Sequence, residues 1–405
     1  MLLVLLALPL LFCAALAQSG AGNSAGVASY SVDWNVGRQQ LIASILAQEG
    51  TPTPHQNSVM ASPPTITNTS SQPSGLTQCN SWPNNVGQFG YWGGASFTYG
   101  GNGRMFPVAT RGTSGGNVTG GQDAVSWRVE AQVTSAKFAW AIYTNATNFR
   151  LIVNGQYTSL TGYTPASGSV VYLTLDFTSI GGSAPRDIIL EGEQAQVVVG
   201  ICSSPGDVVA YPSTFPVIRS PLRIITAGDS ITAGSGPTYQ NDGPIPQLCE
   251  QLGASDCWAS GVGGTGFVDT TGSLFILPQR VLDTASFCRY VAMTAMGVND
   301  VGTVDQPTEQ AAATTVLSAY RAQCPQAIII VIGPWDQNAP SAPATGYAAI
   351  KTALINSCAG VAGCFFIDVQ GLAYEKASGP HPTAAGATTM ANFVYAAIKA
   401  MLGIS

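Results

Sequence analysis

The hydrophobic positions follow two different patterns along the chain, and each pattern predicts a different kind of structure. From residue 221 to the C-terminus, near-continuous apolar runs alternate with segments of helical spacing. Such runs are typical of strands that are buried on both faces of a parallel sheet. The runs are LRIITAG, YVAMTAMG, AIIIVIGP and CFFIDV. The alternation predicts an α/β domain over residues 221–405, with a parallel sheet between layers of helices.

Residues 79–218 instead contain short β-rich runs that are separated by Gly, Asn, Ser and Pro, without a helical stretch. The Asn-Gly pair in VNGQ is typical of a tight hairpin. This region therefore predicts an all-β sandwich of the jelly-roll type. Its aromatic residues have two interpretations, either a face that stacks on sugars or the core of the sandwich, which is the commoner role. These residues are Trp127, Trp140, Tyr143 and Phe149.

The N-terminal 78 residues have features of export and of a linker. Residues 1–17 are apolar and end in Ala-Leu-Ala, which fits the cleavage site of a secretory signal peptide. An uncleaved anchor is the alternative, although the stretch is short for a membrane span. Residues 18–78 contain one amphipathic run and then a segment rich in Ser, Thr, Pro and Asn. We expect a short helix followed by a linker.

The overall composition argues against nucleic-acid binding and fits an exported protein. The net charge is −6, and the charged residues, 9% of the chain, form no basic cluster. Sequons for N-glycosylation begin at Asn68, Asn117 and Asn145. We expect a secreted monomer without stable membrane association.

The cysteine count also fits export. The chain has nine cysteines, and eight remain once Cys13 leaves with the signal peptide. An even number in an exported chain predicts disulfides. The pairs favoured by local spacing are Cys249–Cys257, Cys288–Cys324 and Cys358–Cys364, which leaves Cys79–Cys202. A structural zinc site is the competing interpretation, but the chain has no CxxC pair and only two histidines, so we expect no metal.

Four short blocks at the ends of predicted α/β elements carry candidate chemistry. In Gly228-Asp229-Ser230 the glycine permits a sharp turn, so that Ser230 would begin the next helix as a nucleophile or as a plain N-cap. The glycines of ASGVGGTGF (259–267) either approach a substrate oxygen or form a turn. Asn299 in GVND either donates to an oxyanion or forms a turn. His381, in HPT before the last predicted helix, is either a general base or a structural loop residue.

In this order and setting, the four blocks resemble the SGNH (GDSL-type) hydrolase family. The resemblance covers residues 221–405, and GVGGTGF and VIGPW resemble a bacterial branch in which a β-domain precedes the catalytic domain. It implies a flavodoxin-like three-layer α/β/α sandwich after the jelly-roll-like domain. It also implies a serine esterase that works without a metal or an organic cofactor.

The resemblance implies a role for each matching position. Ser230 would attack an ester carbonyl, and His381 would accept its proton and return it to the leaving alcohol. The oxyanion would be bound by the backbone N–H groups of Ser230 and Gly263, with Gly264 as the alternative, and by the side chain of Asn299. Composition supports His381 independently, because the only other histidine, His55, lies in the predicted linker.

The acid that the family places three residues before the histidine is missing, because Ser378 occupies that position. Loss of this acid from a serine triad can cost on the order of 10⁴ in turnover. A backbone carbonyl or Ser378 itself could orient the ring. Alternatively, Glu375, our first choice, or Asp368 could replace the acid. A decayed site that only binds is the third possibility, and the presence of the other site residues argues against it.

The sequence therefore predicts a secreted serine esterase that hydrolyses carboxylic esters, with acetyl groups on polysaccharides as the best-matched substrate. The polysaccharide is an inference by analogy, since the layout of domains does not fix a substrate. One alternative is an acyltransferase that uses the same serine. The other is a non-catalytic polysaccharide-binding protein with a degenerate hydrolase domain.

Overall fold

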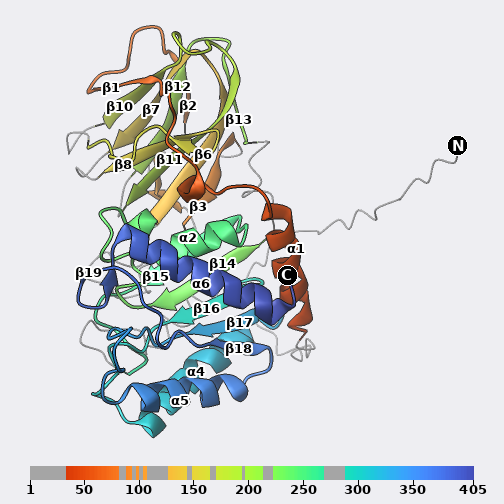
Figure 1. Cartoon of the computed structure of the whole chain (residues 1–405). Helices are drawn as coiled ribbons and strands as arrows, with labels where there is room; N and C mark the ends of the chain where they lie inside the picture. Colours follow the sequence, from red (N-terminus) through yellow and green to blue (C-terminus); the bar gives the residue numbers. More distant parts are fainter. Residues whose placement is uncertain are drawn as a thin grey trace, which may run out of the picture. The chain divides into compact units, whose positions relative to one another are not determined.

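One parallel and two antiparallel sheets carry most of the strands in the computed structural model of the chain (Figure 1). The structure describes residues 33–81, 88–93, 97–99, 104–106, 126–143, 148–164, 170–193, 197–212, 222–268 and 288–405. Residues 32–405 belong to one compact unit. The predicted signal peptide and the predicted boundary at 218–221 lie outside the described residues, so both stay predictions.

The parallel sheet confirms the α/β prediction. Its strands are ordered β15-β14-β16-β17-β18, and every neighbouring pair is parallel. This is the 2-1-3-4-5 order of flavodoxin-like folds. The strands span Arg223–Gly228 (β14), Asp256–Gly261 (β15), Val291–Ala295 (β16), Ile328–Ile332 (β17) and Cys364–Ile367 (β18). Four of them match the predicted apolar runs, and β15 was missed because DCWASG is rich in small and polar residues.

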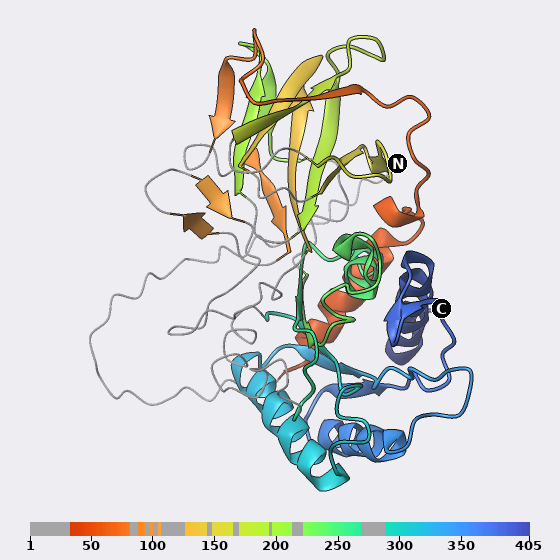
Figure 2. The ribbon, with the colours of Figure 1, turned by 90° about the vertical axis from the view of Figure 1, so that its left-hand side faces the viewer.

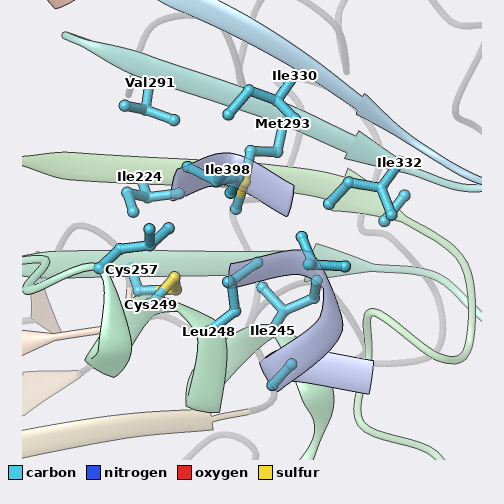
Figure 3. Close-up of a cluster of buried hydrophobic side chains, with 14 of the residues drawn as sticks. Ile224, Ile245, Leu248, Cys249, Cys257, Val291, Met293, Ile330, Ile332 and Ile398 are labelled. Carbon is cyan, nitrogen blue, oxygen red and sulfur yellow. A yellow bond between two sulfur atoms is a disulfide. The ribbon is translucent and has the colours of Figure 1, made fainter. Parts of the chain in front are cut away.

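Helices cover both faces of this sheet and complete three layers (Figure 1). The helices are α1 (Asn35–Gln48), α2 (Pro244–Gln251), α4 (Gln306–Gln323), α5 (Tyr347–Ala359) and α6 (Ala384–Leu402). One face packs on α1, α2 and α6, and Figure 3 shows Ile398 of α6 beside Ile224 and Met293 of the sheet. The other face packs on α4 and α5, which run side by side in Figure 2. Successive residues of each strand therefore serve opposite faces, which explains the continuous apolar runs.

The β-rich region confirms the sandwich prediction. In the described residues, one sheet has the order β1-β10-β7-β12-β5-β4 with β2 beside β12, and the other has β13-β6-β11-β8-β9 with β3 beside β6. All of their pairs are antiparallel, and one hydrophobic cluster lies between the sheets. The long strands are Ser126–Thr134 (β6), Lys137–Tyr143 (β7), Phe149–Val153 (β8), Val170–Asp176 (β10), Pro185–Glu193 (β11) and Val197–Ser203 (β12). The short ones are Thr65–Thr69 (β1), Gln78–Ser81 (β2), Gly90–Trp92 (β3), Phe97–Tyr99 (β4), Arg104–Phe106 (β5), Gln156–Tyr157 (β9) and Val208–Ala210 (β13).

Two details of the sandwich bear on the sequence predictions. The VNGQ hairpin forms between β8 and β9, with left-handed φ values of 48° at Asn154 and 81° at Gly155, as a tight primed turn requires. Strand β1 lies inside the expected linker, because the β-branched TITNT favours an extended edge strand despite its polar neighbours. Its sequon residue Asn68 is exposed.

Three of the four aromatic residues that could have formed a surface for sugars lie in the core of the sandwich. Trp127, Trp140 and Phe149 are each 0% exposed and belong to the cluster between the sheets. The side chain of Tyr143 lies outside the described residues. The core interpretation therefore holds for the three residues whose burial is described.

Three of the four expected disulfides are present. They are Cys79–Cys202, Cys249–Cys257, which joins α2 to β15 in Figure 3, and Cys358–Cys364. The expected Cys288–Cys324 bond is wrong for this structure, because neither residue is disulfide-bonded. Their side chains are nevertheless hydrogen-bond neighbours, and burial together with this contact raises the pKa of the Cys288 thiol well above its usual value.

None of the described helices combines the length and the apolar character needed to cross a membrane.

Candidate active site

Ser230 and His381 lie 151 positions apart in the sequence and meet in the fold. The Nε2 atom of His381 is 2.8 Å from the Oγ atom of Ser230. Ser230 lies two residues after the end of β14, and His381 lies in β20 (His381–Pro382), shortly before α6. At this distance the ring can accept the hydroxyl proton, which is the first requirement for a serine nucleophile and its base.

Ser230 begins a single turn rather than the helix that the sequence predicted. The turn closes through the hydrogen bond from the Ala233 N–H to the Asp229 carbonyl. It then stops, because Gly234 and Gly236 have φ values of 79° and 115° in the left-handed region, which a helix does not use. The prediction that Ser230 begins a helix is therefore wrong. The serine nevertheless lies at the start of a turn after the first strand, as expected.

Asp229 fixes this turn from the inside. Its carboxyl group is 0% exposed, and Oδ1 accepts the Ile231 N–H at 2.8 Å. Burial raises the pKa of Asp229 to about 7, although the N–H groups of Ile231 and Thr232 act in the opposite direction. The serine is thus presented by a turn whose own donors are satisfied by its neighbour.

Two glycines let the serine turn lie directly on the sheet. A Cβ atom at Gly228 would lie 2.0 Å from Oγ1 of Thr232 and 2.5 Å from the carbonyl oxygen of Ala295. A Cβ atom at Gly261, on β15, would lie 2.1 Å from the Ala233 nitrogen. Any side chain at these positions would push the turn away from the sheet. The two glycines therefore allow the turn that carries Ser230 to pack closely against the strands.

The glycine block and the GVND block are bonded to each other. The side-chain N–H of Asn299 donates to the Thr265 carbonyl at 2.8 Å. The buried Asp300 carboxyl accepts the Phe267 N–H at 2.7 Å and the Val268 N–H at 3.3 Å. Gly263 and Gly264 therefore lie in a loop whose far end is fixed by two side chains from the end of β16.

These blocks come together because their strands are neighbours. Strand β14 pairs with both β15 and β16, so that Gly228 is in register with Gly261 and with Ala295. The N–H of Val262 also donates to the Gly228 carbonyl at 3.0 Å. Ser230, the 262–268 loop and Asn299 thus follow the carboxyl ends of three adjacent parallel strands, where ligands bind in open α/β sheets.

His381 is held by a short ladder of its own. Strand β20 pairs with β19 (Lys376–Ser378), and Ser378 is the direct cross-strand partner of His381. Between described residues, the bond to Ser230 is the one hydrogen bond that the His381 ring makes. Glu375 is exposed, and its backbone carbonyl accepts the Thr383 N–H. Asp368 instead contacts Lys351 and accepts the Gln370 N–H at 3.0 Å.

The sequence motifs contain two aspartates to which the sequence alone assigned no role. Asp229 stands in the GDS triplet and Asp300 in GVND, and both are 0% exposed acceptors of backbone N–H groups. A signal for them existed, since an aspartate inside a turn motif commonly bonds its own backbone. No group of three His, Cys, Asp or Glu side chains in the described ranges is arranged to hold a metal ion.

The α/β part of the chain is a GDSL-like hydrolase domain. Residues 226–388 match the family described as "GDSL-like Lipase/Acylhydrolase family". The matched residues include all four motif blocks. The resemblance inferred from the motifs is thereby confirmed for this domain, which is an ester hydrolase domain of the SGNH type. No curated protein matches the chain in sequence.

Solved structures share the two-part architecture. A family two carbohydrate esterase from Cellvibrio japonicus has a TM-score of 0.61 at 11% identity and covers 84% of this chain and 99% of its own. An acetyl xylan esterase from the rumen bacterium Butyrivibrio proteoclasticus has a TM-score of 0.53 at 16% identity, with coverage of 84% and 99%. A salicylyl-acyltransferase from a tetracycline biosynthetic pathway has a TM-score of 0.59 at 14% identity, with coverage of 80% and 98%. At these identities the likeness shows the fold.

Proposed function

We propose that the protein hydrolyses acetyl esters of carbohydrates, with Ser230 as the nucleophile and His381 as the general base. The observation that carries this proposal is the 2.8 Å contact between His381 Nε2 and Ser230 Oγ. In the first half-reaction Oγ attacks the ester carbonyl, His381 takes its proton and passes it to the leaving alcohol. In the second half-reaction, His381 takes a proton from a water molecule as the water oxygen attacks the acyl-enzyme. The proton then passes to Ser230 Oγ, and the carboxylic acid is released.

The oxyanion formed in each step needs donors that are already in place. We assign this role to the backbone N–H groups of Ser230 and Gly263 and to the Asn299 side chain. The bond from Asn299 to Thr265 and the bonds from Phe267 and Val268 to Asp300 support the assignment, because they fix the loop that carries Gly263. Donors on a fixed loop need not reorganise when charge develops on the substrate.

His381 would act as the base of a dyad. No carboxylate among the described residues is hydrogen bonded to its ring. Its backbone is held instead by the ladder between β19 and β20 and by the Tyr374 hydroxyl, which donates to the Pro380 carbonyl at 2.8 Å. Glu375 as a substitute acid stays a prediction.

The acetylated carbohydrate as substrate rests on the similar carbohydrate esterases. Export fits the three disulfides, since such bonds persist in oxidising compartments. We also propose a monomer. An acyltransferase is the second candidate, because one similar structure is an acyltransferase and a sugar or alcohol can replace water as the acyl acceptor.

The direct test is ester hydrolysis by purified protein and by two variants. Ser230→Ala and His381→Ala should each lower the kcat for an aryl acetate by at least about 10³. Their thermal melting should match that of the wild type, because Ser230 and His381 are both partly exposed. Full turnover in either folded variant would refute the mechanism. Faster loss of the acyl group to an added sugar than to water would favour the acyltransferase.

A further inference from the structure

A cavity of about 720 Å³ lies where three parts of the chain meet. Its walls come from residues 54–59, from the β-sandwich beside β8 and β9, and from the α/β domain at residues 238–247 and the first turns of α6. This volume falls within the range of small-molecule sites. Neither Ser230 nor His381 lines it, so the cavity is distinct from the dyad.

The cavity nevertheless adjoins the dyad through two segments. Gly236 lies against the His381 strand, where an added Cβ atom would be 2.1 Å from the Pro382 carbonyl oxygen and 3.0 Å from the His381 Cβ atom. Two residues further on, Thr238 and Tyr239 line the cavity. Ala384, three residues after His381, lines it from the other side. A molecule in the cavity would therefore lie next to the segments that carry the general base.

The charged side chains around the cavity form ion pairs with one another. Arg150 donates to Asp242 at 2.7 Å and to Glu191 at 2.8 Å, and His55 contacts Asp242 at 3.0 Å and Glu250 at 2.9 Å. Arg128 completes the set by pairing with Glu191 and Glu250. Three cations thus face three carboxylates in a closed network. An anionic or cationic ligand would find no net charge to pair with.

The remaining walls are apolar or carry neutral polar groups. Leu160, which is 59% exposed, Val59 and two alanines of α6 supply the apolar surface. Thr161 and Thr238 are exposed, and their hydroxyl groups make no hydrogen bond to another described residue. Apolar contact combined with neutral hydrogen-bonding groups suits the C–H faces and hydroxyl groups of a sugar ring.

We propose that this cavity is the subsite for the carbohydrate portion of the ester, the part that leaves as the alcohol. This inference rests on the proposed function and adds to it the place where the sugar binds. An acetyl group has two carbon atoms and would leave a cavity of this size almost empty. Only the oxygen of the leaving alcohol must lie beside His381, which returns a proton to it, and the rest of the sugar would extend past Gly236 and Ala384 into the cavity.

Tyr239 joins the two sides of this subsite. Its hydroxyl accepts the Gly162 N–H at 2.5 Å, and its ring lies 4.5 Å from the Arg150 guanidinium carbon. The α/β domain and the sandwich therefore share one wall of the cavity. The accessory domain would thus act by completing the sugar site.

The test uses two adjacent threonines of α6. Thr388 lines the cavity and Thr389 does not, although both are exposed and each hydroxyl donates to the helical carbonyl four residues earlier. Thr388→Trp should fill the cavity, and Thr389→Trp is the matched control. Ala385→Phe fills the same cavity and leaves the Thr388–Gln247 hydrogen bond in place, in case that bond matters for folding.

The readout is the kcat/KM for acetylated xylo-oligosaccharides divided by that for an aryl acetate. Thr388→Trp and Ala385→Phe should lower this ratio at least about tenfold, and Thr389→Trp should leave it within about twofold. Equal ratios in Thr388→Trp and Thr389→Trp would overturn the subsite.

A binding measurement separates this proposal from the proposed function. Xylohexaose is titrated into Ser230→Ala protein that carries either tryptophan. Binding that survives Thr389→Trp and is lost in Thr388→Trp supports the subsite even if the wild type hydrolyses no ester. Equal binding to both variants, or to neither, would overturn it whatever the esterase assay gives.

Discussion

Ser378 and His381 are direct cross-strand partners in the ladder between β19 and β20. Side chains of directly paired residues lie on the same side of a ladder. The position where the family keeps its acid is therefore beside His381, the proposed general base, and it is occupied by an exposed serine.

Ser378→Asp should restore the missing acid. The new carboxylate would accept the Nδ1 proton of His381 and stabilise the imidazolium formed during attack. We expect the kcat for an aryl acetate to rise or stay level, and the acid limb of the pH–rate profile to move to higher pH. Ser378→Asn is the matched control without charge and should leave the acid limb in place. A large loss of activity in folded Ser378→Asp protein would mean that residue 378 does not face the ring.

Glu375→Gln decides between a dyad and a substitute acid. Because Glu375 is exposed and has no hydrogen bond to the His381 ring, we expect kcat to change less than about threefold. A fall of about 10² or more, with normal melting, would make this glutamate the acid of the triad. Asp368→Asn, at the other acid considered, should also have little effect because Asp368 is bonded elsewhere.

Asp300 should hold the loop that carries the oxyanion donors. In Asp300→Asn one of the two backbone N–H groups, at Phe267 or Val268, would face an amide N–H₂ in place of a carboxylate oxygen. We expect a loss of about 1–3 kcal/mol in unfolding free energy and a lower kcat, measured by denaturant titration and ester hydrolysis. Asp305→Asn is the control, because Asp305 is an exposed N-cap of α4 and asparagine caps equally well. Equal effects of the two substitutions would contradict the role of Asp300.

Cys288 and Cys324 should be the two reactive positions in a thiol count. Non-reducing peptide mapping should recover the bonds Cys79–Cys202, Cys249–Cys257 and Cys358–Cys364 and find free thiols at the other two positions. Cys324 should be labelled only after denaturation because it is buried, whereas Cys288 is half-buried. Recovery of a Cys288–Cys324 peptide from unreduced protein would show that oxidation completes the fourth bond. In that case the pairing expected from spacing would hold in solution.

The sequence predicted those features that depend on local pattern or on strand order. Continuous apolar runs gave the strands β14, β16, β17 and β18, and their carboxyl ends brought Ser230 near Asn299. The helix after Ser230 was wrong, because left-handed glycines at 234 and 236 stop it after one turn. Strand β15 lacked an apolar run and was identified only as a glycine block.

The sequence contained no local pattern that predicted the network of ion pairs around the cavity. His55 meets Glu250 and Asp242 across 195 and 187 positions, so neither the linker composition nor any spacing could reveal the contact. A histidine in a segment rich in Ser, Thr and Pro is usually solvated, whereas this one lies in a short 3₁₀ turn, Pro54–Gln56, and contacts the α/β domain and also Tyr157 of the sandwich. Long-range ion pairs of this kind become visible only when the fold is known.

His55 should make the stability of the protein depend on pH between neutral and alkaline values. Burial disfavours the imidazolium, but the carboxylates of Glu250 and Asp242 outweigh this and raise the pKa of His55 from 6.5 to about 9. Because the folded pKa lies above the unfolded one, the stabilisation is fully present below about pH 6.5 and is lost as the pH rises through 9. A shift of this size corresponds to about 3 kcal/mol at most.

The measurement is the free energy of unfolding at pH 6 and at pH 9.5 for the wild type and for His55→Gln. The wild type should lose more stability over this interval than the variant. Buried Glu130 and Glu309, whose pKa values are raised to about 8 and about 9, also lower stability as the pH rises, but they act equally in both proteins. His381→Gln is the matched control, since it removes a histidine that contacts a serine hydroxyl and lies outside the charge network. If His55→Gln and the wild type lose the same stability between the two pH values, His55 carries no proton in the folded network, and the balance of three cations and three carboxylates around the sugar subsite is wrong.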